Sequence, residues 1–204
     1  RTTASDGVGP NQPQPDNELG LKIAKGATLF MLGLPGASYL YQGEELGLPE
    51  HTTLEDKFRQ DPTFARTKGA RVGRDGCRVP LPWDQTSDSS GFSETGKSWL
   101  PQPESYRELA RSKQEVDASS TLAFYKQALA LRKELALGEG SFGWVSGHTG
   151  PDSLGYENSG VRVIYNFGKD PINLGSAEIL ISSGPIVGGQ LESNQCVWVK
   201  LSSD

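Results

Sequence analysis

One apolar segment near the start of the chain restricts the possible folds more than any other feature. Residues 19–34 leave only a thin polar face on a helix, because apolar side chains stand at Leu19, Leu21, Ile23, Ala24, Ala27, Leu29, Phe30, Met31 and Leu32. Such a helix is stable only where most of its surface is buried. The sequence therefore predicts a helix that starts at Asp16 or Asn17, either of which could cap it, inside a larger assembly.

A Pro-Gly break ends this helix, and the stretch ASYLYQG (residues 37–43) has the tyrosine-rich pattern of a short strand. Two adjacent carboxylates, Glu44 and Glu45, follow at its tip. Neighbouring side chains of an extended segment point to opposite faces, whereas the acid and base of a glycosidase flank one bond from different elements. We therefore expect these carboxylates to pair with nearby arginines rather than to act as a catalytic pair.

Residues 44–118 show no convincing periodicity, but they are rich in aromatic and arginine side chains, which indicates an ordered loop. The stretch GRDGCRVPLPWD (residues 73–84) brings the guanidinium of Arg78 and the aromatic face of Trp83 into one turn-rich segment. Aromatic platforms and charged forks bind sugars, so this composition fits carbohydrate recognition. An equal alternative is an arginine–carboxylate network that only pins the loop.

The second half of the chain changes from helix to short strands. Residues 119–136 predict a helix capped by Ser119 or Ser120, with Arg132 and Lys133 suited to the negative end of its dipole. The turn Asn158-Ser159-Gly160 predicts a hairpin. Strands are expected at 153–158, 161–167, 177–182 and 196–201. Together they predict a small antiparallel sheet or sandwich packed on the helical part.

Composition excludes several function classes. A net charge of −5 without any block of basic residues argues against a nucleic-acid partner. The longest apolar run, 27–34, is too short to cross a membrane. Two cysteines, Cys77 and Cys196, and two histidines, His51 and His148, lack metal-ligand spacing, so neither a metal nor another cofactor is expected. The isolated thiols, together with a polar start that lacks a signal-peptide pattern, predict a cytoplasmic protein.

Three motifs give the chain a family resemblance. The stretch LFMLGLPGASYLYQGEELGLPE (29–50) resembles the end of the catalytic barrel in oligo-1,6-glucosidase-like α-glucosidases of the α-amylase superfamily. GCRVPLPWD (76–84) resembles the RTPMQWD-type loop after the eighth strand, and STLAFYKQALALRKE (120–134) resembles the eighth barrel helix. The resemblance implies an α+β chain: the last helix–strand–helix part of a (β/α)8 TIM barrel (1–138), then a small antiparallel β-sandwich domain (139–204).

The resemblance also implies where the chemistry lies. The family cleaves α-glucosidic bonds with retention, using a nucleophilic Asp, an acid/base Glu and a stabilising Asp on the fourth, fifth and seventh strands. All three positions would precede Arg1, and Asp6 lies beyond the expected place, so no catalytic residue is assigned in this chain. Substrate-adjacent candidates are Gln42, Glu44, Arg78 and Trp83.

Arg78 and Trp83 match the family arginine and tryptophan, and the resemblance gives Arg78 the role of holding the loop at the pocket, near the aglycone side of the substrate. Cys77 and the residues Val79-Pro80-Leu81-Pro82 depart from the family pattern, which puts the details of that contact in doubt.

Three functions remain open at this point. The parent protein would be an exo-acting α-glucosidase on short α-linked oligosaccharides or disaccharides, or a trehalose synthase or sucrose isomerase of the same superfamily. A third reading is a non-catalytic carbohydrate-binding or structural module. The expected partners are an α-glucosidic oligosaccharide and either the N-terminal barrel portion or a second copy of the chain, because the apolar helix would otherwise expose a large surface. By itself the 204-residue chain is expected to be inactive.

Overall fold

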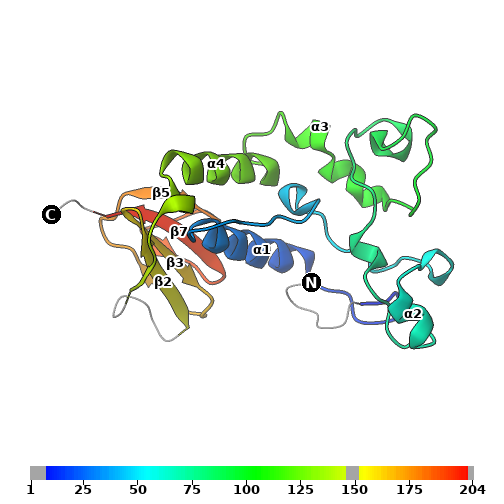
Figure 1. Ribbon diagram of the computed structural model, residues 1–204, viewed down its shortest axis with the longest axis horizontal. Coiled ribbons are helices and arrows are strands. Elements are labelled where there is room, and N and C mark those ends of the chain that lie inside the picture. The colour runs from blue at the N-terminus through cyan, green and yellow to red at the C-terminus, as the bar shows by residue number, and fades with distance from the viewer. Residues whose placement is uncertain (1–7, 146–151, 202–204) are drawn as a thin grey trace. The chain divides into compact units, whose positions relative to one another are not determined.

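The computed structural model describes residues 8–145 and 152–201. Asp6 and His148 lie outside these ranges. The chain divides into two compact units, here called the loop unit and the sheet unit, which comprise Arg1–Gly20 with Leu40–Tyr125 and Leu21–Tyr39 with Lys126–Asp204, respectively. Short helices and irregular segments dominate the loop unit, whereas the sheet unit holds all the strands (Figure 1).

The described residues form a mixed α+β structure, as predicted. The α-helices are α1 (Asn17–Leu32), α2 (Pro62–Arg66), α3 (Arg111–Gln114) and α4 (Thr121–Glu134). Short 3-10 helices occupy Glu44–Leu46, Asp56–Phe58, Asp75–Cys77, Asp88–Gly91, Glu104–Leu109 and Leu137–Glu139. The strands are β1 (Gly143–Trp144), β2 (Ser153–Asn158), β3 (Val161–Asn166), β4 (Ile172–Asn173), β5 (Ile179–Ser182), β6 (Gln190–Leu191) and β7 (Gln195–Lys200). No helix in the described ranges is both long and apolar enough to span a membrane.

Both long helices begin at the predicted caps. Asp16 Oδ1 accepts a hydrogen bond from the backbone N–H of Leu19 at 3.0 Å, and Ser120 Oγ accepts one from the N–H of Ala123 at 3.1 Å. Helix α1 is less buried than predicted: Leu19 is 42% exposed. The buried residues of α1 are Gly26, Thr28, Leu29 and Leu32.

The strand predicted over residues 37–43 is wrong. Residues 37–41 have no regular secondary structure, and the chain then turns into the 3-10 helix Glu44–Leu46. Within the described ranges, no neighbouring strand pairs with this segment, and Tyr39 is 86% exposed. A strand is held by hydrogen bonds to its neighbours, and the described residues supply no other barrel strand to make them.

The predicted hairpin is confirmed. Strands β2 and β3 pair antiparallel with Asn158 opposite Val161, and the two residues between them have positive φ angles, 50° at Ser159 and 77° at Gly160. Two successive positive φ values match the turn type that suits a twisted two-residue hairpin. The hairpin belongs to a five-stranded antiparallel sheet of order β1-β2-β3-β7-β5, beside a two-stranded β4-β6 sheet.

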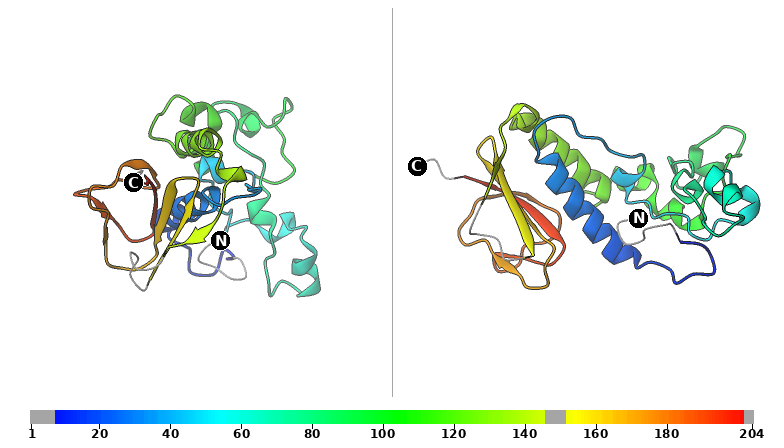
Figure 2. Two further views of the ribbon diagram at one scale, coloured as in Figure 1. Left: turned by 60° about the vertical axis from the view of Figure 1, so that its left-hand side comes forward. Right: turned by 60° about the horizontal axis from the view of Figure 1, so that its bottom comes forward.

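Helix α1 packs on one face of the larger sheet (Figure 2). Tyr156, Val163 and Trp198 form one cross-strand row on this face, and all three are fully buried. Trp198 Nε1 donates to the carbonyl of Leu29 at 3.0 Å, and Tyr156 Oη donates to that of Phe30 at 2.5 Å. These polar ends are satisfied without water, so aromatic rings can fill the interface between helix and sheet.

The opposite face of the larger sheet packs on the smaller one. Ile164 of β3 and Val197 and Val199 of β7 share a hydrophobic cluster with Leu191 of β6 and Ile172 of β4. Side chains of both sheets therefore meet in one hydrophobic cluster. The domain boundary predicted at residue 138 stays a prediction.

Arg132 of α4 fastens the end of α1. Its Nη1 donates to the carbonyls of Leu32 and Leu34, the latter at 2.6 Å, and its Nη2 donates to that of Gly36 at 2.5 Å. The last carbonyls of a helix have no partner within it, and the guanidinium satisfies that of Leu32 together with two carbonyls just beyond the helix end. Arg132 was predicted to act at the end of its own helix, and the structure shows its guanidinium at the end of α1.

Candidate functional site

A pocket of about 430 Å³ opens in the loop unit. It is lined by Gln42, Arg78, Pro80, Leu81, Trp83, Phe92 and Trp99. Gln42, Arg78 and Trp83 were predicted as substrate-adjacent from the sequence, and they come together here across 41 positions of the chain. A concave surface with several aromatic faces and a few polar groups is the usual form of a small-molecule site.

Three aromatic side chains give the pocket its apolar surface. Trp83, Phe92 and Trp99 are 47%, 44% and 49% exposed, so each keeps about half of its surface open. Phe92 and Trp99 were noted in the sequence only as loop aromatics and were not assigned to a site. No periodic pattern marks them, and the only available signal was the unusual density of aromatic residues in an irregular segment.

Backbone hydrogen bonds hold the aromatic segments together. The N–H groups of Trp83 and Asp84 both donate to the carbonyl of Ser90, at 2.8 and 2.9 Å. This ties the segment that carries Trp83 to the turn that leads to Phe92. Buried Val79 and Leu100, the chain neighbours of Arg78 and Trp99, belong to one hydrophobic cluster. Packing of these neighbours fixes the two pocket residues without regular secondary structure.

Arg78 lies between the pocket and two carboxylates. Its Nη1 donates to Asp61 Oδ2 at 3.1 Å and lies 3.9 Å from Asp75 Oδ1. The Arg78 side chain is 39% exposed, whereas those of Asp61 and Asp75 are 8% and 1% exposed. One side of the guanidinium is thus held from within the protein while the remainder is open to a ligand.

Asp61 is itself held by three donors. It accepts from the N–H of Thr63 at 2.8 Å, which makes it the cap of α2, and from the N–H of Arg74 at 3.0 Å in addition to Arg78. The hydrogen bond from Thr63 is the largest cause that holds the pKa of Asp61 well below its usual range, and the bonds from Arg74 and the charge of Arg78 act in the same direction. Asp61 is therefore a carboxylate at every pH at which the protein would normally work.

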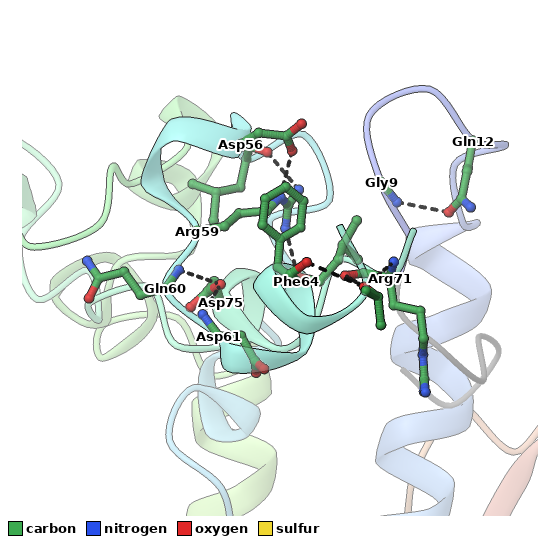
Figure 3. A network of polar contacts seen from close by, with 12 residues as sticks. Gly9, Gln12, Asp56, Arg59, Gln60, Asp61, Phe64, Arg71 and Asp75 are labelled. Atoms are coloured by element: carbon green, nitrogen blue, oxygen red, sulfur yellow. Dashed lines mark hydrogen bonds and ion pairs between the residues drawn. The ribbon is translucent and has the colours of Figure 1, made fainter. Parts of the chain in front are cut away.

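Asp75 holds the backbone at Asp61 (Figure 3). Its Oδ2 accepts from the backbone N–H groups of Gln60 and Asp61 at 3.0 and 2.9 Å. Its Oδ1 is buried and has no hydrogen-bond partner among the described residues. The charge of this oxygen faces Arg78, so its contact with the guanidinium is electrostatic and not a hydrogen bond.

A second arginine in the same unit pins the loop. Arg59 donates to Asp56 Oδ1 at 3.0 Å, to the carbonyl of Leu54 at 2.7 Å and to that of Val72 at 3.3 Å (Figure 3). Its side chain is 2% exposed, and it does not line the pocket. Arg59 therefore pins the loop, whereas Arg78 both joins an arginine–carboxylate network and lines the pocket. Carbohydrate recognition by the stretch 73–84 stays a prediction.

Glu44, the remaining sequence candidate, is not among the residues that line the pocket. Neither Glu44 nor Glu45 forms an ion pair with an arginine of the described residues, contrary to expectation, because the predicted strand tip is a 3-10 helix. Glu45 Oε2 instead accepts from the N–H of Gly43 at 2.9 Å. Burial is the largest cause that raises the pKa of the Glu44 carboxyl, and the charge of the neighbouring Glu45 acts in the same direction.

The described side chains that line the pocket are aromatic, aliphatic, amide and guanidinium groups. None of the described residues that line it is Asp, Glu, His, Cys or Lys. Nor do the described ranges hold a group of three His, Cys, Asp or Glu side chains that could bind a metal ion. The lining thus combines aromatic and aliphatic surfaces with one amide and one guanidinium.

Curated proteins resemble this chain over part of their length. A probable alpha-glucosidase of Rhizobium meliloti (strain 1021) is 39% identical over 122 residues, which are 58% of this chain and 22% of that protein. An oligo-1,6-glucosidase of Parageobacillus thermoglucosidasius is 29% identical over 136 residues, 58% of this chain and 24% of that protein. The chain thus spans less than a quarter of the length of these two relatives.

A solved structure extends the likeness to the strands. The crystal structure of the alpha-glucosyl transfer enzyme XgtA matches with a TM-score of 0.71 and 33% sequence identity, covering 94% of this chain and 36% of that one. Residues 14–140, more than half of the chain, match the family of the alpha amylase catalytic domain. The resemblance inferred from the motifs is confirmed, and the chain belongs to the alpha-amylase catalytic domain family.

Proposed function

We propose that a longer protein containing this chain is a retaining α-glucosidase that releases terminal α-linked glucose from short oligosaccharides or disaccharides. Family membership and the names of the two curated relatives support this proposal. Within the chain, the proposal rests on the pocket that Arg78 lines together with the aromatic side chains of Trp83, Phe92 and Trp99.

The pocket would form one wall of the substrate site. Aromatic faces suit the C–H faces of a pyranose ring, and the guanidinium of Arg78 and the amide of Gln42 can donate to ring hydroxyls. We place Arg78 on the aglycone side of the bond that is cleaved. In this proposal Glu44, in the 3-10 helix that follows Gln42, lies near the substrate without lining the pocket.

The chain alone is proposed to be inactive. A retaining glycosidase needs two carboxyl groups about 5–5.5 Å apart on either side of the bond. The residues that line the pocket supply neither of them. In the longer protein, further barrel strands would bring these carboxylates and would also pair with the exposed segment 37–41. Hydrolysis by the purified 204-residue chain would contradict this part of the proposal.

Glucosyl transfer is the second candidate, because XgtA is named an alpha-glucosyl transfer enzyme. Transfer, isomerisation and hydrolysis differ in how well water is excluded from the glycosyl-enzyme intermediate. Incubating the longer protein with maltose and a labelled acceptor sugar separates them. Free glucose as the main product supports hydrolysis, whereas label in a disaccharide supports transfer. Trehalulose or another rearranged disaccharide from sucrose would indicate an isomerase.

We also propose that the protein works in the cytoplasm. Cys77 and Cys196 are both unpaired thiols, which suits a reducing compartment. Fractionation of cells that express the longer protein tests this, and recovery in the medium or periplasm would contradict it.

A further inference from the structure

The charge environment of Arg78 bears on which saccharides the pocket can accept. Among the described residues that line the pocket, Arg78 is the only charged one. Two buried carboxylates stand behind it, those of Asp61 and Asp75. We propose that Asp61 and Asp75 are positioning residues that hold Arg78 and cancel its charge, so that the pocket selects neutral saccharides and rejects phosphorylated ones. This inference rests on the proposed function in taking the ligand to be a saccharide.

The holding role follows from the hydrogen bonds. Arg78 Nη1 donates to Asp61 Oδ2 at 3.1 Å, and Asp61 is fixed in turn by the N–H groups of Thr63 and Arg74. Asp75 accepts from the N–H of Asp61 and thereby fixes the backbone that carries this carboxylate. The guanidinium is thus anchored to a rigid carboxylate, and fewer of its rotamers remain to be ordered when a ligand binds.

The cancelling role follows from the oxygen that has no partner. Oδ1 of Asp75 is buried, makes no hydrogen bond to any described residue and lies 3.9 Å from Arg78 Nη1. An asparagine could accept the same two backbone hydrogen bonds that Oδ2 accepts. The hydrogen bonds of Asp75 therefore do not require a negative charge, whereas compensation of Arg78 does.

Two carboxylates against one guanidinium leave a net negative charge behind the pocket. A phosphate group that entered the pocket would meet no uncompensated cation. It would lose its interactions with water, and no equally favourable charge interaction would replace them. A neutral sugar needs no counter-charge: the held guanidinium can still donate from its remaining N–H groups to hydroxyls, and the aromatic faces pack on the ring.

The experiment compares glucose with glucose 6-phosphate, which differ only in the phosphate. Binding of each to the full 204-residue chain is measured by calorimetric titration, and inorganic phosphate serves as a third probe. The variants are Asp75→Asn, Asp61→Asn and the double variant Asp75→Asn/Arg78→Gln. Asp56→Asn is the matched control, because it removes the carboxylate partner of Arg59, which does not line the pocket.

We expect the unaltered chain to bind glucose more tightly than glucose 6-phosphate. Asp75→Asn should raise the affinity for glucose 6-phosphate about fivefold to tenfold, as expected when one negative charge is removed within several ångströms of the ligand. The affinity for glucose should change less than twofold. Asp61→Asn should raise the affinity for glucose 6-phosphate and also lower the affinity for glucose, because Arg78 loses the carboxylate that holds it. The control should leave the affinity for both ligands unchanged. Adding Arg78→Gln to Asp75→Asn should abolish the gain in affinity for glucose 6-phosphate.

The inference is overturned if Asp75→Asn raises the affinity for glucose 6-phosphate no more than Asp56→Asn does. It is also overturned if the raised affinity persists in the double variant. If Asp61→Asn does not fold, Asp75→Asn still decides, because it keeps the backbone hydrogen bonds. If no variant binds glucose, the pocket is not a saccharide site in the 204-residue chain by itself, and the activity of the longer protein is decided by its own product analysis; an Arg78-dependent gain in affinity for inorganic phosphate would still support the cancelling role of the two carboxylates.

Discussion

Arg78 and Asp61, 17 positions apart in the chain, are joined by a hydrogen bond of 3.1 Å between Nη1 and Oδ2. The bond closes a long irregular segment onto itself beside the pocket. It also connects the cap of α2 with the residue that faces a ligand, since Asp61 accepts from Thr63 and Arg78 together. Loss of this pair should therefore affect both stability and binding.

The stability of the chain should depend on the ionisation of Asp61. The pKa of Asp61 is lowered in the folded chain, chiefly by the hydrogen bond from Thr63, so its contribution is present above the pKa of an unfolded aspartate, about 3.9, and is lost as the pH falls through the folded value. Asp61→Asn should cost roughly 1–3 kcal/mol at pH 7, with the difference shrinking below pH ~4. Urea unfolding of both proteins between pH 7 and pH 3 measures this.

Asp56→Asn is the control for that series, because the Asp56 side chain is 69% exposed and asparagine keeps an oxygen that can accept the hydrogen bond from Arg59. Its unfolding free energy should stay within about 0.5 kcal/mol of the unaltered chain. A cost of Asp61→Asn that remained the same from pH 7 to pH 3 would show that the ionised carboxylate is not what stabilises the loop.

Removal of a pocket aromatic should weaken sugar binding. Trp83→Ala and Trp99→Ala should each lower the affinity of the 204-residue chain for maltose about tenfold, because each deletes a half-exposed ring that packs on the sugar. Trp144→Ala removes a ring that is 66% exposed but lies in the sheet unit, and it should leave the affinity unchanged. Equal losses in all three variants, by calorimetric titration, would contradict the assignment of the pocket.

Two glycines of the first helical segment should respond to alanine in opposite ways. A Cβ at Gly33 would lie 2.4 Å from Tyr156 Oη and 2.7 Å from Val163 Cγ2, so Gly33→Ala should destabilise the sheet unit by about 1–3 kcal/mol. Gly20, inside α1, has nothing within 4 Å of its Cβ position, and Gly20→Ala should stabilise by about 0.5–1 kcal/mol. Thermal unfolding checks both, and a neutral Gly33→Ala would contradict the close helix–sheet packing.

Arg132 should be more important for stability than its neighbour Lys133. Arg132→Met leaves the carbonyls of Leu32, Leu34 and Gly36 without their donor, and it should cost about 2–3 kcal/mol. Lys133→Met, on an exposed position of the same helix, should stay within about 0.5 kcal/mol. Urea unfolding compares them, and equal costs would mean that the contact at the end of α1 contributes little.

Local signals in the sequence predicted the elements that depend on local chemistry. The caps at Asp16 and Ser120 and the hairpin turn at Ser159-Gly160 were all found where side-chain and backbone preferences placed them. The segment 37–43 was predicted as a strand and is not one, because pairing depends on neighbours that residue preferences alone cannot supply.

The candidate site was predictable only where a motif marked it. Arg78 and Trp83 lie in one motif, and both face the pocket. Phe92 and Trp99 reach it through backbone bonds and buried neighbours that leave no pattern in the sequence. Asp61 was missed for the same reason, since its contact with Arg78 exists only after the loop has closed.

The most direct test of the proposed function is the anomeric form of the glucose that a longer protein containing this chain releases from maltose or isomaltose. Proton NMR during the first minutes of the reaction distinguishes the α- from the β-anomer before they interconvert. We predict release of α-glucose, as a retaining mechanism requires. Release of β-glucose, or no glucose from any α-linked di- or oligosaccharide, would contradict the proposal.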